Sequence, residues 1–116
     1  MQLTIDGPSI LICSHPVDFR YGINGLIGVA LSILNADVQK NILIFYNRSR
    51  DKLKILAWHK TGYILLLKRL EKGHFFNLKS DEPATVITPQ QLSWLLAGLD
   101  WISMSEWGEL TYHDFH

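Results

Sequence analysis

Acidic residues are scarce in the middle of this 116-residue chain, where most of the basic residues lie. Ten of the eleven Lys and Arg residues fall between Lys40 and Lys79, and only Asp51 and Glu71 oppose them there, which leaves that segment with a net charge of +8. The rest of the chain holds Arg20 against nine acidic residues, a net charge of −8. The formal net charge of zero therefore results from two opposed blocks, and this separation predicts a partner of negative charge for the middle segment.

The chain has a single cysteine, Cys13, which lies within an apolar run. An intrachain disulfide is impossible, so we expect a reduced, cytoplasmic setting and a Cys13 side chain buried in the core. The sequence also lacks an apolar stretch of roughly 20 residues, the length needed to span a bilayer. It does not begin with a basic segment followed by an apolar one, so neither membrane attachment nor a signal peptide is expected.

The patterns of common catalytic sites are missing as well. No Gly-rich phosphate-binding loop is present, and the five His residues do not form a cluster with the spacing of metal ligands. A two-metal nuclease needs several converging carboxylates, whereas Asp18, Asp51, Glu71 and Asp100 are scattered along the chain. We therefore expect a protein that is not an enzyme and that carries no metal and no cofactor.

What is present is the composition of a folded domain, with 47% apolar and 19% charged residues. We predict one domain over residues 1–101 and an acidic, aromatic tail over residues 102–116. Within the domain, residues 9–13 read as a buried strand. Asp18 is a candidate cap for a helix over residues 19–34, in which one stripe of apolar side chains is expected to be buried: Phe19, Ile23, Leu26, Ile27, Ala30, Leu31 and Leu34. Gly22, Gly25 and Gly28 fall off this stripe, which suggests close approach by another backbone or by a ligand.

Strands are predicted over residues 42–46, 53–59 and 63–70, with a possible short strand over 74–76 and an edge strand over 85–87. Short connections between consecutive strands favour antiparallel pairing. A second helix is expected to begin after Thr88, because Pro89 and Gln91 complete a capping-box pattern. The predicted fold class is thus α+β, an antiparallel β-meander of four to six strands with two packed helices.

The leading candidate for a binding site is the basic meander. Its cations are concentrated at the hairpin after residue 47 and at the end of the following strand: Arg48, Arg50, Lys52, Lys54, Lys68, Arg69 and Lys72. Such a surface can contact nucleic-acid phosphates, with Trp58 or Tyr46 available for stacking on bases. Two alternatives remain open: ordinary solvated charges that protect sheet edges or pair with the chain's own acids, and a docking surface for an acidic protein.

A second candidate is the segment Pro16–Gly22, which places Arg20 and free amide groups at a predicted helix start, where an anion can bind. The structural alternative is that Asp18 caps the helix while Arg20 pairs with a nearby carboxylate.

Four ordered blocks resemble a known family. Pro16–Gly22 resembles the signature Pro-x-Asp-Met-Arg-Lys-Gly, and Asn47–Trp58 resembles Asn-Arg-x-x-x-x-Leu-Lys-Ile-Leu-x-Trp. The blocks Lys68–Phe75 and Thr88–Trp101 follow in the same order. Together they are similar to TnpB, the small accessory protein encoded by bacterial insertion sequences of the "insertion sequence sixty-six" family, and not to the RNA-guided nuclease that shares the name.

The resemblance implies a non-catalytic accessory role in DNA transposition beside a larger transposase that carries the catalytic acids. DNA and the transposase are therefore the expected partners, and an adaptor that docks on the transposase without touching DNA is the alternative. Phe19 and Tyr21 stand where the family pattern has Met and Lys, so a cationic contact in that block depends on Arg20 alone.

Overall fold

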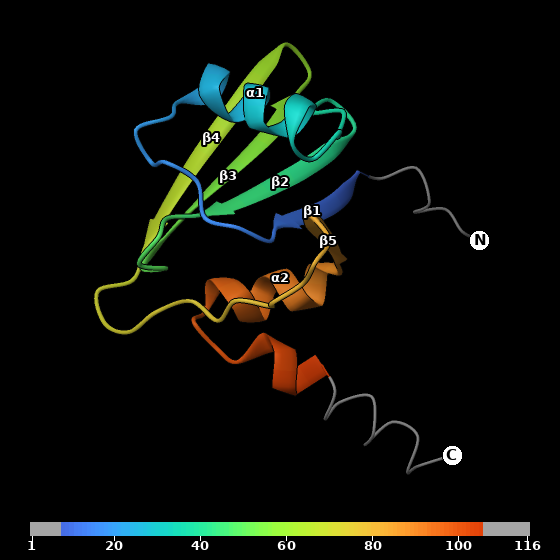
Figure 1. Ribbon diagram of the computed structural model, residues 1–116. Helices are drawn as coiled ribbons and strands as arrows, with labels where there is room; N and C mark the ends of the chain where they lie inside the picture. The colour runs from blue at the N-terminus through green and yellow to red at the C-terminus, as the bar shows by residue number, and fades with distance from the viewer. Residues whose placement is uncertain (1–7, 106–116) are drawn as a thin grey trace, which may run out of the picture.

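The computed structural model describes residues 8–105 and contains one five-stranded sheet with helices on both of its faces (Figure 1). In chain order the elements are β1 (Ser9–Cys13), α1 (Ile23–Ser32), β2 (Asn41–Tyr46), β3 (Lys52–His59), β4 (Gly62–Arg69), β5 (Ala84–Ile87) and α2 (Pro89–Leu96). A short helical segment follows at residues 101–105. The predicted α+β class is confirmed.

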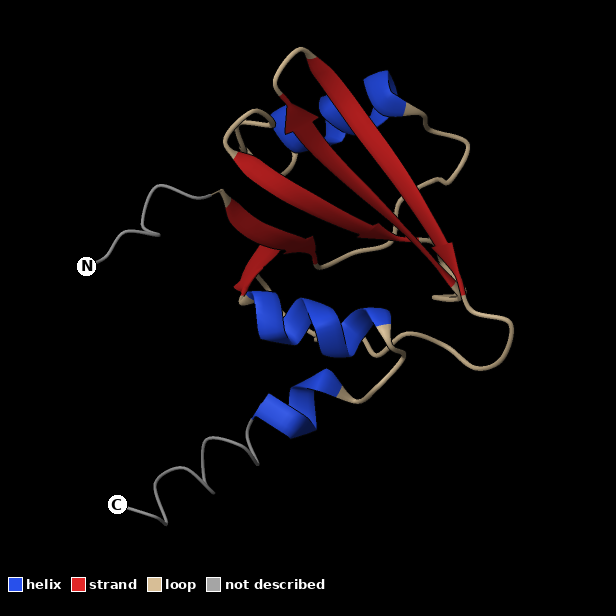
Figure 2. Cartoon of the chain, turned by 180° about the vertical axis from the view of Figure 1, so that it is seen from behind, coloured by secondary structure: helices blue, strands red, loops and turns tan. Residues whose placement is uncertain are grey.

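The sheet is mixed, so the prediction of a purely antiparallel meander is wrong in one part. The strand order is β4-β3-β2-β1-β5, and β2, β3 and β4 form the expected antiparallel meander (Figure 2). β1, however, pairs with β2 in parallel, because the chain between them crosses over through α1. A short loop between consecutive strands requires antiparallel pairing, whereas a connection long enough to contain a helix also permits parallel pairing.

Alternation of side chains along the strands builds two separate cores. On one face, Leu43 and Phe45 of β2 pack with Cys13 of β1 and with Leu26 and Ala30 of α1. The Cys13 side chain is buried, as predicted, and its burial raises the pKa of the thiol.

The opposite face packs against α2. Ile44 and Tyr46 of β2 lie with Ile10 of β1, Leu95 of α2 and Trp101, all of them fully or almost fully buried. β2 is thus apolar on both faces and central in the sheet, as its sequence predicts.

α1 begins later than predicted, at Ile23, and Asp18 does not cap it. The N-cap residue is Gly22, which has no side chain to accept a hydrogen bond. Asp18 instead accepts hydrogen bonds from the backbone and side chain of Arg20. The backbone carbonyls of Phe19 and Tyr21 accept from the Lys54 ammonium, so this segment is ordered by contacts with the sheet.

The apolar stripe of α1 is confirmed in most of its positions. Leu26 and Ala30 are fully buried and mark the centre of the buried arc, whereas Leu31 lies beyond its edge and is 60% exposed. No other backbone is among the nearest atoms at the off-stripe glycines. The three atoms nearest to a methyl group at Gly25 all belong to the Tyr21 side chain, and nothing lies within 4 Å of one at Gly22 or Gly28.

Residues 70–83 contain no strand, so the predicted strand over 74–76 is wrong. The backbone groups of residues 75 and 76 form hydrogen bonds with other segments instead of with a strand. Phe75 N donates to Arg50 O, and Phe76 O accepts from the Tyr46 hydroxyl and the Trp101 indole. The Phe75 side chain is completely buried and completes the core beneath α2.

The N-terminus of α2 has the predicted capping box. Thr88 Oγ1 accepts from Gln91 N at 3.1 Å, and Gln91 Oε1 accepts from Thr88 N at 2.8 Å. Beyond α2, Ile102 packs against the same core as Trp101. The remainder of the predicted tail, from residue 106 onward, lies outside the described residues. None of the helices within residues 8–105 combines the length and the apolar character that a bilayer crossing demands.

A candidate phosphate-binding surface at one end of the sheet

The turn between β2 and β3 is the centre of the candidate site, and it is built by its own polar side chains. Asn47 Nδ2 donates to Asp51 Oδ1 at 2.6 Å, and Lys52 N donates to Asn47 Oδ1 at 3.1 Å. Ser49 Oγ donates to the same Asp51 oxygen at 3.2 Å. These hydrogen bonds lower the pKa of Asp51, with the bond from Asn47 as the main cause. The single carboxylate of the turn is thus occupied within it.

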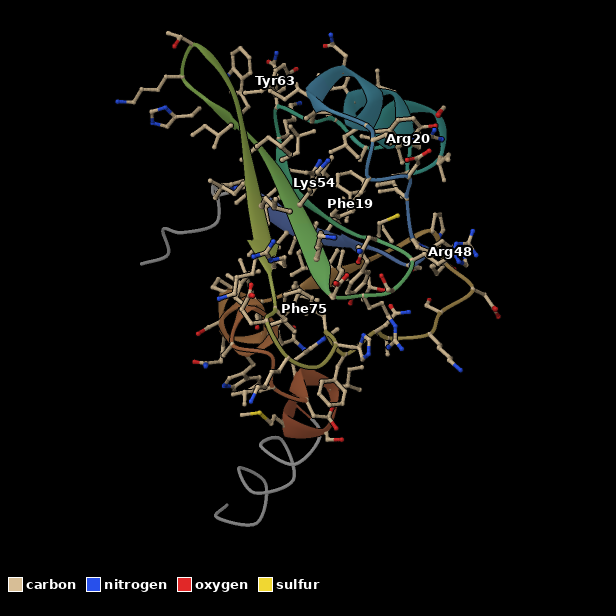
Figure 3. All side chains as sticks on the ribbon, turned by 90° about the vertical axis from the view of Figure 1, so that its left-hand side faces the viewer. Phe19, Arg20, Arg48, Lys54, Tyr63 and Phe75 are labelled. Carbon is tan, nitrogen blue, oxygen red and sulfur yellow. The ribbon has the colours of Figure 1, made fainter. Side chains whose placement is uncertain are left out.

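Lys54 joins the turn region to the segment before α1. Its ammonium Nζ donates to Phe19 O at 2.7 Å and to Tyr21 O at 2.8 Å, and it lies 4.7 Å from the centre of the Phe19 ring (Figure 3). The sequence analysis places Lys54 among the candidate binding cations, and the structure shows its ammonium bonded to backbone carbonyls within the fold. Through these contacts Lys54 brings together the two blocks Pro16–Gly22 and Asn47–Trp58.

Arg20 is held by Asp18 in a bidentate ion pair, so the structural alternative is right that Arg20 pairs with a nearby carboxylate and wrong that Asp18 caps the helix. Arg20 Nε lies 3.0 Å from both Asp18 oxygens, and its Nη2 donates to Asp18 Oδ2 at 2.6 Å. The hydrogen bonds from Arg20 lower the pKa of Asp18 from its ordinary 3.8 to about 2. The guanidinium side chain is nevertheless 90% exposed, so it remains open to solvent on its outer side.

The loop after β4 docks onto the same turn from the other side. Leu70 N donates to Asp51 O at 2.8 Å, Phe75 N donates to Arg50 O at 2.7 Å, and His74 Nδ1 donates to Ser49 O at 2.6 Å. The turn therefore contacts the block Lys68–Phe75 directly. Through Phe76 O, which accepts from Trp101 Nε1, that segment also reaches the block Thr88–Trp101. All four blocks that carry the sequence resemblance meet around this end of the sheet.

We call this region the basic end and define it by residues 47–54, 68–75 and 18–20. Eight cations belong to it: Arg20, Arg48, Arg50, Lys52, Lys54, Lys68, Arg69 and Lys72. Three acids lie among them, Asp18, Asp51 and Glu71, so the basic end carries a net charge of +5. Within residues 8–105, ion pairs involve only Arg20, with Asp18, and Arg69, with Glu71.

The cations of the basic end are distributed over both faces of the sheet. Lys52 pairs with Arg69 across β3 and β4, and strand alternation places both on the α1 face with Lys54. Lys68 pairs with Leu53, a residue of the α2-side core, and so points to the opposite face. The basic end thus wraps around the tip of the hairpin.

A cleft lies beside the turn and separates it from the segment before α1. Its volume is about 430 Å³, and its lining combines the two segments: Pro16, Val17, Asp18, Phe19, Asn47, Arg48 and Ser49. In Figure 3, Arg20 and Arg48 both lie at the right-hand side of the molecule, and Phe19 lies further inside, beside Lys54. Pro16–Gly22 is therefore part of the same surface as the turn.

The predicted stacking aromatics do not belong to the basic end. Trp58 is half-buried near the far end of β3, where its ring packs edge-on against Tyr63 with centroids 4.9 Å apart. Six residues of extended strand separate it from Lys52, a distance of roughly 20 Å. Tyr46 is buried, and its hydroxyl donates to Phe76 O, so it cannot stack on a base.

The sequence reading missed the roles of Asn47 and Phe75. Asn47 organises the turn with Asp51, and an Asn followed at short spacing by Ser and Asp is a signal for such a side-chain-bonded turn. Phe75 fixes the loop after β4 against the turn through a contact between distant segments, for which the sequence contains no local signal. Within the described part of the chain, His, Cys, Asp and Glu side chains form no group of three that could hold a metal ion.

The fold and the site define a small α+β domain whose basic end is assembled from four separate segments around one polar turn. Residues 8–106 match the family TnpB_IS66, described as IS66 Orf2-like protein, and the chain belongs to this family. Membership associates it with transposition of insertion sequences as an accessory protein. The resemblance found in the four blocks is thereby confirmed.

Two relatives come from the bacterium Sinorhizobium fredii (strain NBRC 101917 / NGR234). The chain is 39% identical to protein y4jC over 100 residues, which cover 82% of this chain and 86% of the relative. It is 32% identical to protein y4hO over 93 residues, which cover 79% and 81% of the two chains. No solved structure matches the chain significantly.

Proposed function

We propose that this protein is a non-catalytic accessory factor for DNA transposition that binds DNA, alone or together with the transposase, through the phosphate backbone. The basic end is the proposed contact surface. Arg48, Arg50, Lys52, Lys68 and Lys72 are the cations proposed to meet phosphates, and Arg20 and Arg69 flank them. Lys54 is proposed to hold the surface together and not to touch the ligand.

The observation that carries the proposal is the supply of cations without carboxylate partners. Arg48, Arg50, Lys68 and Lys72 are exposed, and none of them is in an ion pair within residues 8–105. Cations gathered in this way attract phosphates and release the counterions condensed on DNA, which is the main source of sequence-independent affinity.

Arg20 and Arg69, the two cations held in ion pairs, can also contact DNA phosphates. The Arg69–Glu71 pair is exposed on both sides, with side-chain exposures of 62% and 76%. Exposed pairs of this kind contribute little to stability, because water screens the two charges. A DNA phosphate can therefore take the place of Glu71 beside Arg69 at little cost. Arg20 can keep its bond to Asp18 and contact a phosphate with its exposed outer side.

The non-catalytic part of the proposal is supported by the positions of the acids in the basic end. Asp18 is bonded to Arg20, Asp51 to Asn47 and Ser49, and Glu71 to Arg69. Each carboxylate thus has a structural partner. The catalytic acids for strand transfer would come from the separate transposase.

The proposal is tested with two variants in which two cations are replaced by glutamates. One variant carries the replacements at the basic end and the other at the opposite end of the sheet, so the change in net charge is the same. The test variant is Arg48→Glu/Lys72→Glu, and the matched control is Lys40→Glu/Lys60→Glu, both measured by fluorescence anisotropy with a labelled duplex of about 30 base pairs. We expect the test variant to lose at least about tenfold in affinity at low salt, because two phosphate contacts become repulsive. The control should retain most of its affinity.

Equal losses in both variants would mean that only the net charge matters, and the proposed surface would be wrong. If the wild-type protein ignores DNA but binds purified transposase, and the test variant loses that binding, the basic end is a docking surface for an acidic protein segment. That outcome would replace DNA contact by the adaptor alternative.

A further inference from the structure

β4 is an edge strand that presents unusually little protection against pairing with another strand. It is eight residues long and hydrogen-bonds only to β3 among the described strands (Figure 2). Three of its large apolar side chains are exposed, Ile64 at 41%, Leu66 at 57% and Leu67 at 61%. Its outer row of backbone donors and acceptors is free of any other strand within residues 8–105.

Monomeric proteins protect such edges with inward-pointing charges, prolines, bulges or very short strands. Over Tyr63 to Leu67 none of these devices is present, since the five residues are all apolar and paired with β3 without interruption. The first charged residue of the strand is Lys68. An exposed, long and apolar edge of this kind is a template for a further strand.

We propose that β4 pairs with β4 of a second copy of this chain, in an antiparallel arrangement centred on Leu65. A two-fold axis perpendicular to the sheet keeps the α1 faces of both copies on the same side of a continuous ten-stranded sheet. Residues opposite each other must then point to the same face, so the axis passes through one residue and not between two.

Centring on Leu65 makes the strand complementary to itself. Leu65 lies opposite Leu65 of the second copy. In the same way Ile64 lies opposite Leu66, and Tyr63 opposite Leu67, of the second copy. Apolar cross-strand pairs of this kind each contribute favourably to a sheet. Lys68 then lies opposite Gly62, which brings no charge and leaves room for the long side chain.

Neighbouring registers are less favourable because of the charges at the ends of the strand. Centring on Ile64 pairs only residues 62–66 of the two strands and places Lys68 beside the turn that holds Lys60, and like charges at close range are destabilising. Centring on Leu66 sets Lys68 against Ile64 and Arg69 against Tyr63. A parallel pairing would set each Lys68 against the other. Charge and apolar pattern therefore select one arrangement, and it holds independently of whether the basic end binds DNA.

This register is tested by disulfide trapping in a Cys13→Ala background. In the proposed dimer the Cα atoms of the two Leu65 residues lie about 4.5–5.5 Å apart. This separation is compatible with a disulfide, so Leu65→Cys should form a covalent dimer under mild oxidation. The control is Leu67→Cys, which is more exposed but would be about 13 Å from its counterpart, too far to be bridged. Efficient trapping of Leu67→Cys, or none of Leu65→Cys, would overturn the register.

A second test does not depend on a cysteine at a half-buried position. Sedimentation equilibrium at about 100 µM should give a dimer for the wild type and a monomer for Leu66→Lys, because the new charges would face the apolar strip of the second copy. The control Val86→Lys changes an apolar residue that is 66% exposed on the other edge strand, β5, and should remain dimeric. A monomeric wild type, or a dimer that dissociates with Val86→Lys and not with Leu66→Lys, would refute the proposal. A monomeric wild type that binds transposase, with that binding lost in Leu66→Lys, would refute the proposal and assign β4 to that partner instead.

Discussion

At the scale of the residue, Lys54 shows how a charged side chain can serve the fold within a surface that we propose to bind a ligand. Its ammonium has three hydrogens, and two of them are donated to the carbonyls of Phe19 and Tyr21. These carbonyls belong to a segment without regular secondary structure, so Lys54 supplies partners that a helix would otherwise provide. From the sequence, Lys54 could not be distinguished from Lys52 or Arg50, since the contacts cross more than 30 residues.

Replacing Lys54 by Met keeps the aliphatic stem and removes the donors. We expect Lys54→Met to lower the free energy of unfolding by about 2 kcal/mol, because two hydrogen bonds from a charged group are lost and two carbonyls lose their partner. Urea denaturation followed by tryptophan fluorescence measures the change. Lys68→Met, at an exposed lysine without such contacts, should stay within about 0.5 kcal/mol of the wild type. A Lys54→Met variant as stable as Lys68→Met would show that the bridge to Phe19 contributes nothing.

At the scale of the element, local patterns predicted what local forces determine. The capping box at Thr88, the central position of β2 and the hairpins that join β2, β3 and β4 all follow from neighbouring residues. The parallel pairing of β1 with β2 was not predicted. A strand, a helix and a second strand in succession favour such a parallel crossover when the connection exceeds about a dozen residues. The start of α1 was misplaced because Asp18 is an equally good partner for Arg20 as for a helix N-terminus. At the candidate site, the sequence predicted which cations gather at the turn, but not that Trp58 lies far from them.

The glycines of α1 give a prediction at this scale. Gly28→Ala should raise the free energy of unfolding by roughly 0.5–1 kcal/mol, because Ala is the better helix former and the space around Gly28 is open. Gly25→Ala should give no such gain, since its new methyl group would lie 2.9 Å from Cβ and Cγ of Tyr21. Urea denaturation of both variants measures the difference. A loss of stability in Gly28→Ala would indicate that something packs against this face of the helix in solution.

At the scale of the whole molecule, the fold concentrates a charge separation that is already present in the sequence. The antiparallel β2-β3 hairpin puts Arg48 and Arg50 at its tip, and the β3-β4 pairing returns Lys68 and Arg69 to the same end. The loop after β4 adds Lys72 by docking on the turn. Cations that are scattered over more than 20 residues thus become one surface. A dimer through β4 would carry two such basic ends, held apart by the antiparallel arrangement.

The salt dependence of DNA binding tests the central claim, that the basic end meets phosphates, most directly. With three to five of the proposed cations in contact with phosphates, a plot of the logarithm of the binding constant against the logarithm of salt concentration should have a slope between about −2.7 and −4.5. The slope should become less steep by about one for each cation removed from the basic end, for example in Arg48→Gln or Lys72→Gln. No binding to duplex DNA at about 50 mM salt, or binding with a slope near zero, would contradict the account.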